Sequence, residues 1–209
     1  MQISITRGLA ELKTLDARIK KAIQDTSYIG LTTGKKPIVG YKDNQAFELK
    51  VKANNQSAGD LIKRRNLIKT AIVASNAATV VTIGRQAMTV AEAIERKSSI
   101  AYEQLQLQKM TSDYAKVLRK FEEEDEKVKA RLDELIKTTF GTDKRPSPDQ
   151  YESTSQPFLE QNAPKLIDPL NLKDQIDRLQ DRIDEFLTNV DFILSESNSI
   201  TRIEIPDSV

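Results

Sequence analysis

The sequence contains no cysteine, no histidine and no tryptophan among its 209 residues. Without cysteine the chain can form no disulfide and offers no thiol nucleophile, and without histidine it lacks the commonest general base and metal ligand of proteins. No spacing of its carboxylates, lysines or serines points to another catalytic arrangement. We therefore predict no catalytic residue, no cofactor and no metal site, and we expect that the protein is not an enzyme.

Aromatic side chains are scarce, at 5% of the residues, and no apolar run approaches the length of a membrane span. The apolar fraction of 38% is enough for a narrow core, so we expect one helical domain over residues 1–209 with long helices packed side by side. The start of the sequence has no apolar signal segment, which favours an intracellular protein. Because the formal net charge is only +1, we predict neither nucleic acid nor membrane as a partner.

Apolar residues recur every three to four positions along four segments, which predicts helices over residues 4–26, 57–76, 90–138 and 170–194. The last helix has the most regular stripe, and its steps are those of a coiled-coil seam, at Ile176, Leu179, Ile183, Phe186, Val190 and Ile193. The expected fold is therefore mainly α, an elongated antiparallel helical bundle or coiled coil.

Two segments interrupt the helical pattern and are predicted as irregular inserts, residues 27–56 and 139–169. The first contains three glycines, one proline and several side chains typical of strands, among them Tyr28, Ile38, Val39, Tyr41 and Phe47. The second is rich in proline. Because connections this long are seldom idle in a compact protein, we predict that both inserts are contact arms.

Several local signals agree on a β-hairpin over residues 79–88. Residues 79–83 have the composition of a strand, and Gly84-Arg85 has the length and the leading glycine of a type II′ turn. Thr89 and Glu92 then form a capping box that opens the next helix. Before the hairpin, Asn76 is expected to end the preceding helix in the left-handed conformation.

Two stretches of the chain match each other, "SNAATVVTI" at residues 75–83 and "SNSITRIEI" at residues 197–205. Both read S-N-x-x-T-x-(V/I)-x-I, so Asn76 and Asn198 would each mark a helix end and a strand would follow, from Thr79 in the first case. Since a lone hairpin is only marginally stable, we predict that a C-terminal strand over residues 200–205 pairs with the hairpin in one small antiparallel sheet.

The stretch "SNAATVVTIGRQAMTVAEAIERK" resembles the central signature of a family of small, poorly characterised bacterial and phage helical proteins, some of them labelled septicolysin-like. The resemblance lies in a helix end, a short hairpin and a helix start with a basic pair, at Asn76, Thr79, Gly84, Met88, Thr89, Ala93, Arg96 and Lys97. It implies a helical protein with a hairpin and supplies no catalytic residue. The septicolysin label would imply a membrane-active toxin.

The third predicted helix is longer than any predicted partner helix, so part of its apolar stripe is expected to face another subunit. The candidate interface residues are those of this stripe and of the two inserts: Tyr28, Ile38, Val39, Tyr41, Phe47, Phe121, Val128, Leu132, Leu135 and Phe158. The predicted partners are other protein subunits, in a homo-oligomer or a multi-protein assembly.

These features favour a structural or assembly protein, most plausibly a component of a bacteriophage virion such as its tail, neck or baseplate. The expected location is then the virion, and otherwise the cytoplasm. A cytoplasmic assembly chaperone or interaction module is the alternative, and a septicolysin-like toxin is the least favoured hypothesis.

Overall fold

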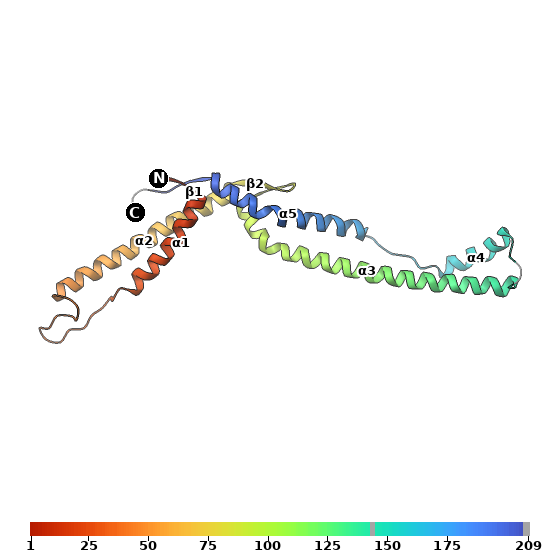
Figure 1. The fold of residues 1–209 in the computed structure, drawn as a ribbon, viewed down its shortest axis with the longest axis horizontal. Coiled ribbons are helices and arrows are strands. Elements are labelled where there is room, and N and C mark those ends of the chain that lie inside the picture. The colour runs from red at the N-terminus through yellow and green to blue at the C-terminus, as the bar shows by residue number, and fades with distance from the viewer. Residues whose placement is uncertain (143–144, 207–209) are drawn as a thin grey trace. The chain divides into compact units, whose positions relative to one another are not determined.

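The computed structural model describes residues 1–142 and 145–206 (Figure 1). Helices dominate these residues and four short strands accompany them. In chain order the elements are β1 (Gln2–Ser4), α1 (Ile5–Gln24), α2 (Asn44–Ala78), β2 (Val80–Ile83), β3 (Gln86–Thr89), α3 (Val90–Phe140), α4 (Pro148–Asn162), α5 (Leu172–Ile200) and β4 (Arg202–Glu204). The predicted mainly α fold with a small antiparallel β component is confirmed.

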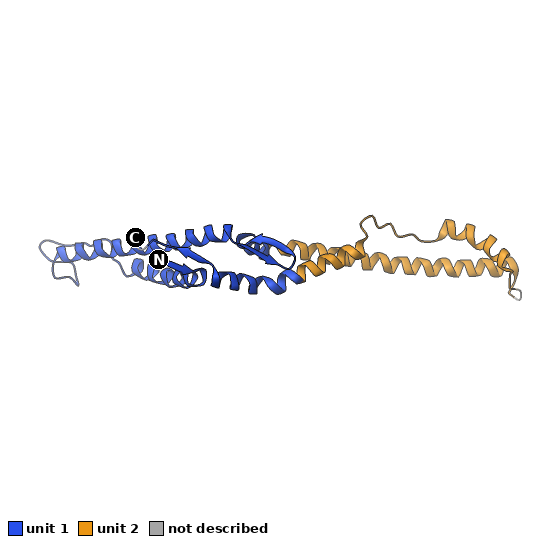
Figure 2. Cartoon of the chain, turned by 90° about the horizontal axis from the view of Figure 1, so that it is seen from above, with its two compact units in different colours: residues 1–98, 185–209 blue, residues 99–184 orange. Residues whose placement is uncertain are grey.

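The chain forms two compact units, which Figure 2 distinguishes by colour. Unit 1 contains residues 1–98 and the chain from residue 185 onward, and unit 2 contains residues 99–184. The long helices α3 and α5 each contribute one part to unit 1 and the other part to unit 2.

The predicted helices at 4–26, 90–138 and 170–194 are confirmed as α1, α3 and α5. The helix predicted at 57–76 is too short, because α2 already begins at Asn44, after Asp43, whose carboxylate accepts the Ala46 N–H at 2.7 Å. The strand-like reading of Phe47 was therefore wrong. Its neighbours show why, since the buried or half-buried positions at Phe47, 51, 54 and 58 step by four, three and four, which is a helical face.

The second predicted insert also contains a helix, α4. Ser147 and Gln150 form its capping box, and Pro148 occupies the first turn, where a missing N–H has no cost. The prolines that suggested an irregular segment thus include one that starts a helix. Residues 163–171 are irregular as predicted, whereas residues 143 and 144 of the insert lie outside the described part of the chain.

The hairpin over 79–88 is confirmed as β2 and β3, joined by Gly84-Arg85, with a φ of +61° at Gly84. The pairing predicted for the C-terminal strand is wrong. β4 pairs antiparallel with β1 and leaves the hairpin as a separate two-stranded sheet. Residues 2–4 supply the partner strand, of which only Ser4 lies within the helix predicted at 4–26.

The predicted helix ends at Asn76 and Asn198 are also wrong, because both residues lie inside helices that continue to Ala78 and Ile200. The matching stretches nevertheless behave alike. The Thr79 N–H donates to the Ser75 carbonyl at 2.8 Å, and the Thr201 N–H donates to the Ser197 carbonyl at 2.9 Å. In both places a helix ends at the threonine and passes directly into a strand.

This likeness extends to an internal repeat within unit 1. In one half α2 leads into β2, and β3 leads into α3. In the other half α5 leads into β4, and β1 leads into α1. The registers agree, since Val81 faces Met88 as Ile203 faces Ile3.

Hydrogen bonds at both ends of the two sheets follow the same repeat. The Val90 N–H donates to the Thr79 carbonyl at 2.9 Å, and the Ile5 N–H donates to the Thr201 carbonyl at 3.1 Å. At the opposite end, the Ile205 N–H donates to the Met1 carbonyl at 2.9 Å, where the hairpin has its turn. The β1–β4 sheet is therefore the counterpart of the hairpin without the connecting turn.

The core beneath the β1–β4 sheet joins strands and helices from both ends of the chain. Its buried members are Ile3, Ile5, Leu12, Leu15, Ile68, Ile72, Ile203 and Ile205. The counterparts of several of these in the other half of the repeat are buried too, namely Val81, Ile83, Val90, Val190 and Leu194. In each half of the repeat, the inward-facing residues of the strands and the apolar residues of the helices are thus buried together on one face of the sheet.

Candidate protein-interaction surfaces

Helices α1 and α2 form an antiparallel hairpin whose far end is the segment 26–42, here named the α1–α2 loop (Figure 1). Two ion pairs tie the helices together, Arg64 with Glu11 at 2.9 Å and Arg65 with Asp16. The segment lies at the opposite end of this hairpin from the β1–β4 sheet.

Several of the predicted interface residues pack together where the loop meets the start of α2. Phe47 is 7% exposed, and the ring of Tyr41 meets it edge to face, with the ring centroids 5.1 Å apart. A Cβ atom at Gly30 would come within 2.6 Å of the Ile38 Cδ1 atom and 3.1 Å of the Phe47 ring, so a larger residue there would displace the end of the Ile38 side chain. Ile38, Tyr41 and Phe47 therefore hold the loop in shape.

Other side chains of the same loop face solvent. Ile29, Leu31 and Val39 are 88%, 91% and 97% exposed, and Tyr28 is about half exposed. Tyr28 and Val39 were among the predicted interface residues, whereas Ile29 and Leu31 were not. Both residues flank Gly30, which packs against Ile38 and the Phe47 ring, and no local signal in the sequence distinguishes them as exposed.

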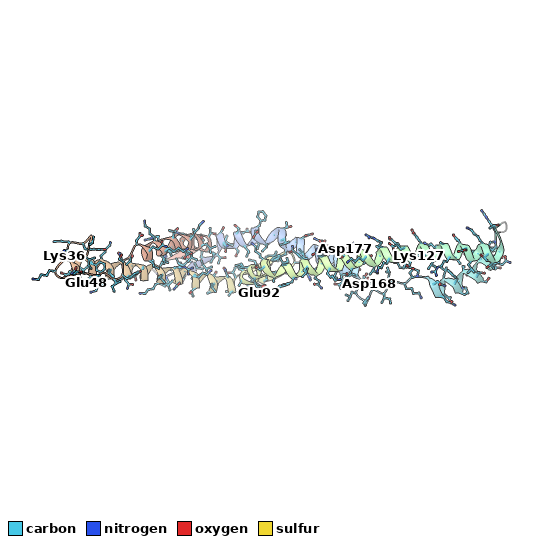
Figure 3. All side chains as sticks on the ribbon, turned by 90° about the horizontal axis from the view of Figure 1, so that it is seen from below. Lys36, Glu48, Glu92, Lys127, Asp168 and Asp177 are labelled. Carbon is cyan, nitrogen blue, oxygen red and sulfur yellow. The ribbon has the colours of Figure 1, made fainter. Side chains whose placement is uncertain are left out.

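The α1–α2 loop is also cationic. Between the two helix-capping residues Asp25 and Asp43 it has three lysines and no acidic residue, and Figure 3 shows Lys36 near this end of the hairpin. Residues 1–78 contain fourteen Lys and Arg against six Asp and Glu, a net charge of +8. Residues 79–209 have eighteen against twenty-five, a net charge of −7. The overall charge of +1 hides this separation.

Unit 2 has an apolar hollow of about 190 Å³ between α3 and the irregular segment 163–171. Its lining includes Tyr114, Val117, Leu118, Leu166, Ile167 and Leu170, of which Ile167 is 93% exposed. Asp168, labelled in Figure 3, holds this segment in place because its carboxylate accepts the Leu172 N–H at 2.7 Å and the Leu170 N–H at 3.2 Å.

The apolar stripe of α3 is covered within the chain over its later part, whereas Ile94, Leu105 and Val117 are exposed. Val128 and Leu132 are 2% and 5% exposed, and Phe121 and Leu135 are half-buried. Figures 1 and 2 both place α4, which includes the half-buried Phe158, beside this part of α3. The expectation that the stripe remains uncovered was therefore wrong at Val128 and Leu132, because α4 was not predicted.

The acidic run at residues 122–126 forms a solvated helix face. Lys127 pairs with Glu124 at 2.8 Å and Lys129 pairs with Asp125 at 2.7 Å. The hydrogen bond that Lys127 donates to Glu124 lowers the pKa of Glu124, and the same bond raises the pKa of Lys127. Across the described residues no group of three His, Cys, Asp or Glu is arranged to hold a metal ion.

The start of α3 has the predicted capping box. The Glu92 carboxylate accepts the Thr89 N–H at 2.6 Å and the Thr89 hydroxyl at 3.0 Å, and the Glu92 N–H donates to that hydroxyl oxygen at 3.1 Å. The backbone hydrogen bond from Thr89 is the main reason why the pKa of Glu92 lies below its ordinary value of 4.5.

The described residues thus form a helical protein with large exposed apolar side chains. None of the described helices has both the length and the apolar content needed to cross a membrane. Comparison of the chain with protein-family models, with curated proteins and with solved structures finds no match.

Proposed function

We propose that the protein is a structural or assembly protein, which acts by binding other protein subunits and not by catalysis. The observation that supports this proposal is the exposure of large aliphatic side chains in two places, at Ile29, Leu31 and Val39 in unit 1 and at Ile167 in unit 2. Several large aliphatic side chains exposed on one short loop are a candidate interaction site. The hollow beside Ile167 has room for an aliphatic side chain of a partner.

The more specific form of the proposal is a component of a bacteriophage virion, in its tail, neck or baseplate. Long helices, the exposed loop and a composition without cysteine or histidine suit a protein that is built into a particle. A cytoplasmic assembly chaperone is the second candidate, because such a protein would use the same exposed surfaces without remaining in the particle.

Native mass spectrometry of the purified protein tests the general proposal, alone and mixed with the products of neighbouring genes. We expect a defined oligomer or a defined complex, weakened in the Ile167→Ser variant and unchanged in a Phe192→Ser control, since Phe192 is also largely exposed but lies outside both surfaces. A single-chain mass at every concentration, with no complex in any mixture, would contradict it.

Quantitative mass spectrometry of purified particles tests the more specific form. A virion component occurs in mature particles at a fixed number of copies. If the protein is found with assembly intermediates and is missing from mature particles, the chaperone hypothesis replaces the virion hypothesis.

A further inference from the structure

We propose that the α1–α2 loop is a docking site for an anionic lipid surface. Its exposed aliphatic side chains enter the headgroup region of the bilayer, and the surrounding lysines bind the anionic headgroups. This inference goes beyond the proposed function, because it assigns Ile29, Leu31 and Val39 to a lipid contact and leaves Ile167 with its neighbouring hollow as the candidate surface for protein partners.

Unpaired positive charge gathers around this end of the hairpin. Seven lysines between residues 20 and 52 are exposed, and none of the seven forms an ion pair within the described residues: Lys20, Lys21, Lys35, Lys36, Lys42, Lys50 and Lys52. The same stretch contains only three acidic residues. Each lysine near an anionic bilayer adds to its attraction, so the charge of the loop is complementary to such a surface.

The aliphatic side chains decide between an anionic membrane and a nucleic acid. Phosphate groups of a nucleic acid would satisfy the lysines but would leave Ile29, Leu31 and Val39 in water, at 88%, 91% and 97% exposure. A bilayer interface receives both kinds of side chain, because binding there grows with buried apolar area and with attraction to anionic lipids. Binding to a bilayer also needs no preformed pocket in the protein.

The backbone of the loop limits how deeply it can enter. Only a few internal hydrogen bonds satisfy it, such as the Thr32 hydroxyl donating to the Lys36 carbonyl at 2.7 Å and the Tyr41 N–H donating to the Ile38 carbonyl at 3.0 Å. Irregular backbone exposed to lipid is excluded from the hydrocarbon core. The loop therefore stays at headgroup depth, and only its aliphatic side chains reach further.

Flotation of the full chain with vesicles tests the proposal. We expect binding to vesicles that contain phosphatidylglycerol and none to pure phosphatidylcholine. The Lys35→Gln/Lys36→Gln variant should bind about fivefold more weakly for each lysine removed. The Lys116→Gln/Lys120→Gln variant loses two exposed lysines of α3 and serves as the matched control.

The absence of tryptophan allows a direct measure of insertion. In the Leu31→Trp variant the only tryptophan sits in the loop, so its emission should shift to the blue with anionic vesicles and be quenched by brominated lipid. The emission of a Phe192→Trp control should stay unchanged, because that side chain lies on α5, outside the loop.

Three outcomes would overturn the proposal. One is equal binding to neutral and anionic vesicles or to neither. Another is unchanged binding by an Ile29→Ser/Leu31→Ser/Val39→Ser variant whose circular dichroism matches that of the parent. The third is an emission shift of the Leu31→Trp variant with duplex DNA or with a second copy of the chain, but not with lipid.

Discussion

Gly8 and Ile203 are matched in size across the core of unit 1. A Cβ atom at Gly8 would lie 3.2 Å from the Ile72 Cδ1 atom and 3.4 Å from the Ile203 Cδ1 atom. The counterparts in the internal repeat are Ala93, which has a Cβ atom, and Val81, which has no δ methyl. Compared with Gly8 and Ile203, the other half of the repeat therefore has one carbon atom more on the helix residue and one carbon atom fewer on the strand residue.

A double-mutant cycle tests this complementarity. Gly8→Ala gains about 1 kcal/mol of helix propensity and loses a similar amount to crowding. Ile203→Val alone costs roughly 1 kcal/mol for the methyl group it removes. We expect the double variant to be more stable than the sum of the single changes by about 0.5 kcal/mol, because Ile203→Val removes one of the close contacts and the nearer Ile72 Cδ1 atom remains.

Urea denaturation measures the coupling, and Ile205→Val is the control, because the Ile205 side chain is not among the nearest neighbours of Gly8. Additive effects of Gly8→Ala and Ile203→Val, within the error found for the control pair, would show that the two positions are not matched.

Two helices begin with capping boxes that differ in charge. At the start of α3 the partner of Thr89 is Glu92, and at the start of α4 the partner of Ser147 is Gln150. The first box contains an ionisable group, Glu92, and the second does not. The pH dependence of stability therefore shows how much the charge of Glu92 contributes to the first cap.

Thr89→Ala should cost about 1 kcal/mol of stability at pH 7. The pKa of Glu92 is lowered in the folded protein, so the stabilisation from its carboxylate is present above its ordinary value of 4.5 and is lost as the pH falls through the lower folded value. The cost of Thr89→Ala should therefore shrink in acid.

Thermal unfolding between pH 3 and pH 7 measures both costs. The cost of Ser147→Ala should stay constant over this range, since Gln150 does not titrate. A cost of Thr89→Ala that is equally large at both ends of the range would mean that the contact between the Thr89 hydroxyl and the Glu92 carboxylate adds nothing to the cap, since the backbone N–H of residue 89 remains in the variant.

Over the described chain, the repeat in unit 1 has one closed and one open connection. The hairpin is closed by Gly84-Arg85, whereas β4 and β1 are paired without a link at the Ile205–Met1 end. Both sheets have the same strand register. A two-residue link like Gly84-Arg85 should therefore also be able to join the end of β4 to the start of β1.

A circular permutant tests this equivalence. Residue 205 is joined to residue 1 through Gly-Arg, and the chain is opened between Gly84 and Arg85. We expect an unchanged circular dichroism spectrum and a midpoint of thermal unfolding within about 5 °C of the parent, because every paired strand is retained. A second permutant, opened inside α2 after Ala58, interrupts a helix and should unfold at a much lower temperature. Equal loss in both would contradict the repeat.

The local pattern of the chain was sufficient for much of the architecture. The apolar spacing predicted α1, α3 and α5, and strand composition, turn and capping box together predicted β2 and β3. In each case the interacting residues lie within a few positions of one another, so a short window contains the complete physical signal.

The candidate surfaces were only partly predictable. Of the predicted interface residues, Tyr28 and Val39 are exposed, whereas Ile38 and Tyr41 pack with Phe47 where the loop meets α2, and Val128 and Leu132 are buried within unit 2. A sequence indicates that a residue is apolar, whereas its exposure depends on which distant segment covers it.

The pairing of β1 with β4 shows most clearly the difference between what a local sequence pattern predicts and what the tertiary structure decides. Composition indicated a strand near residues 200–205, but its partner, residues 2–4, is at the other end of the sequence and is too short to have a pattern of its own. The tertiary structure decides this pairing because Ile3 and Ile203 are buried together against Ile68 and Ile72. The free energy of that burial depends on four segments meeting at once, and no local window of the chain contains it.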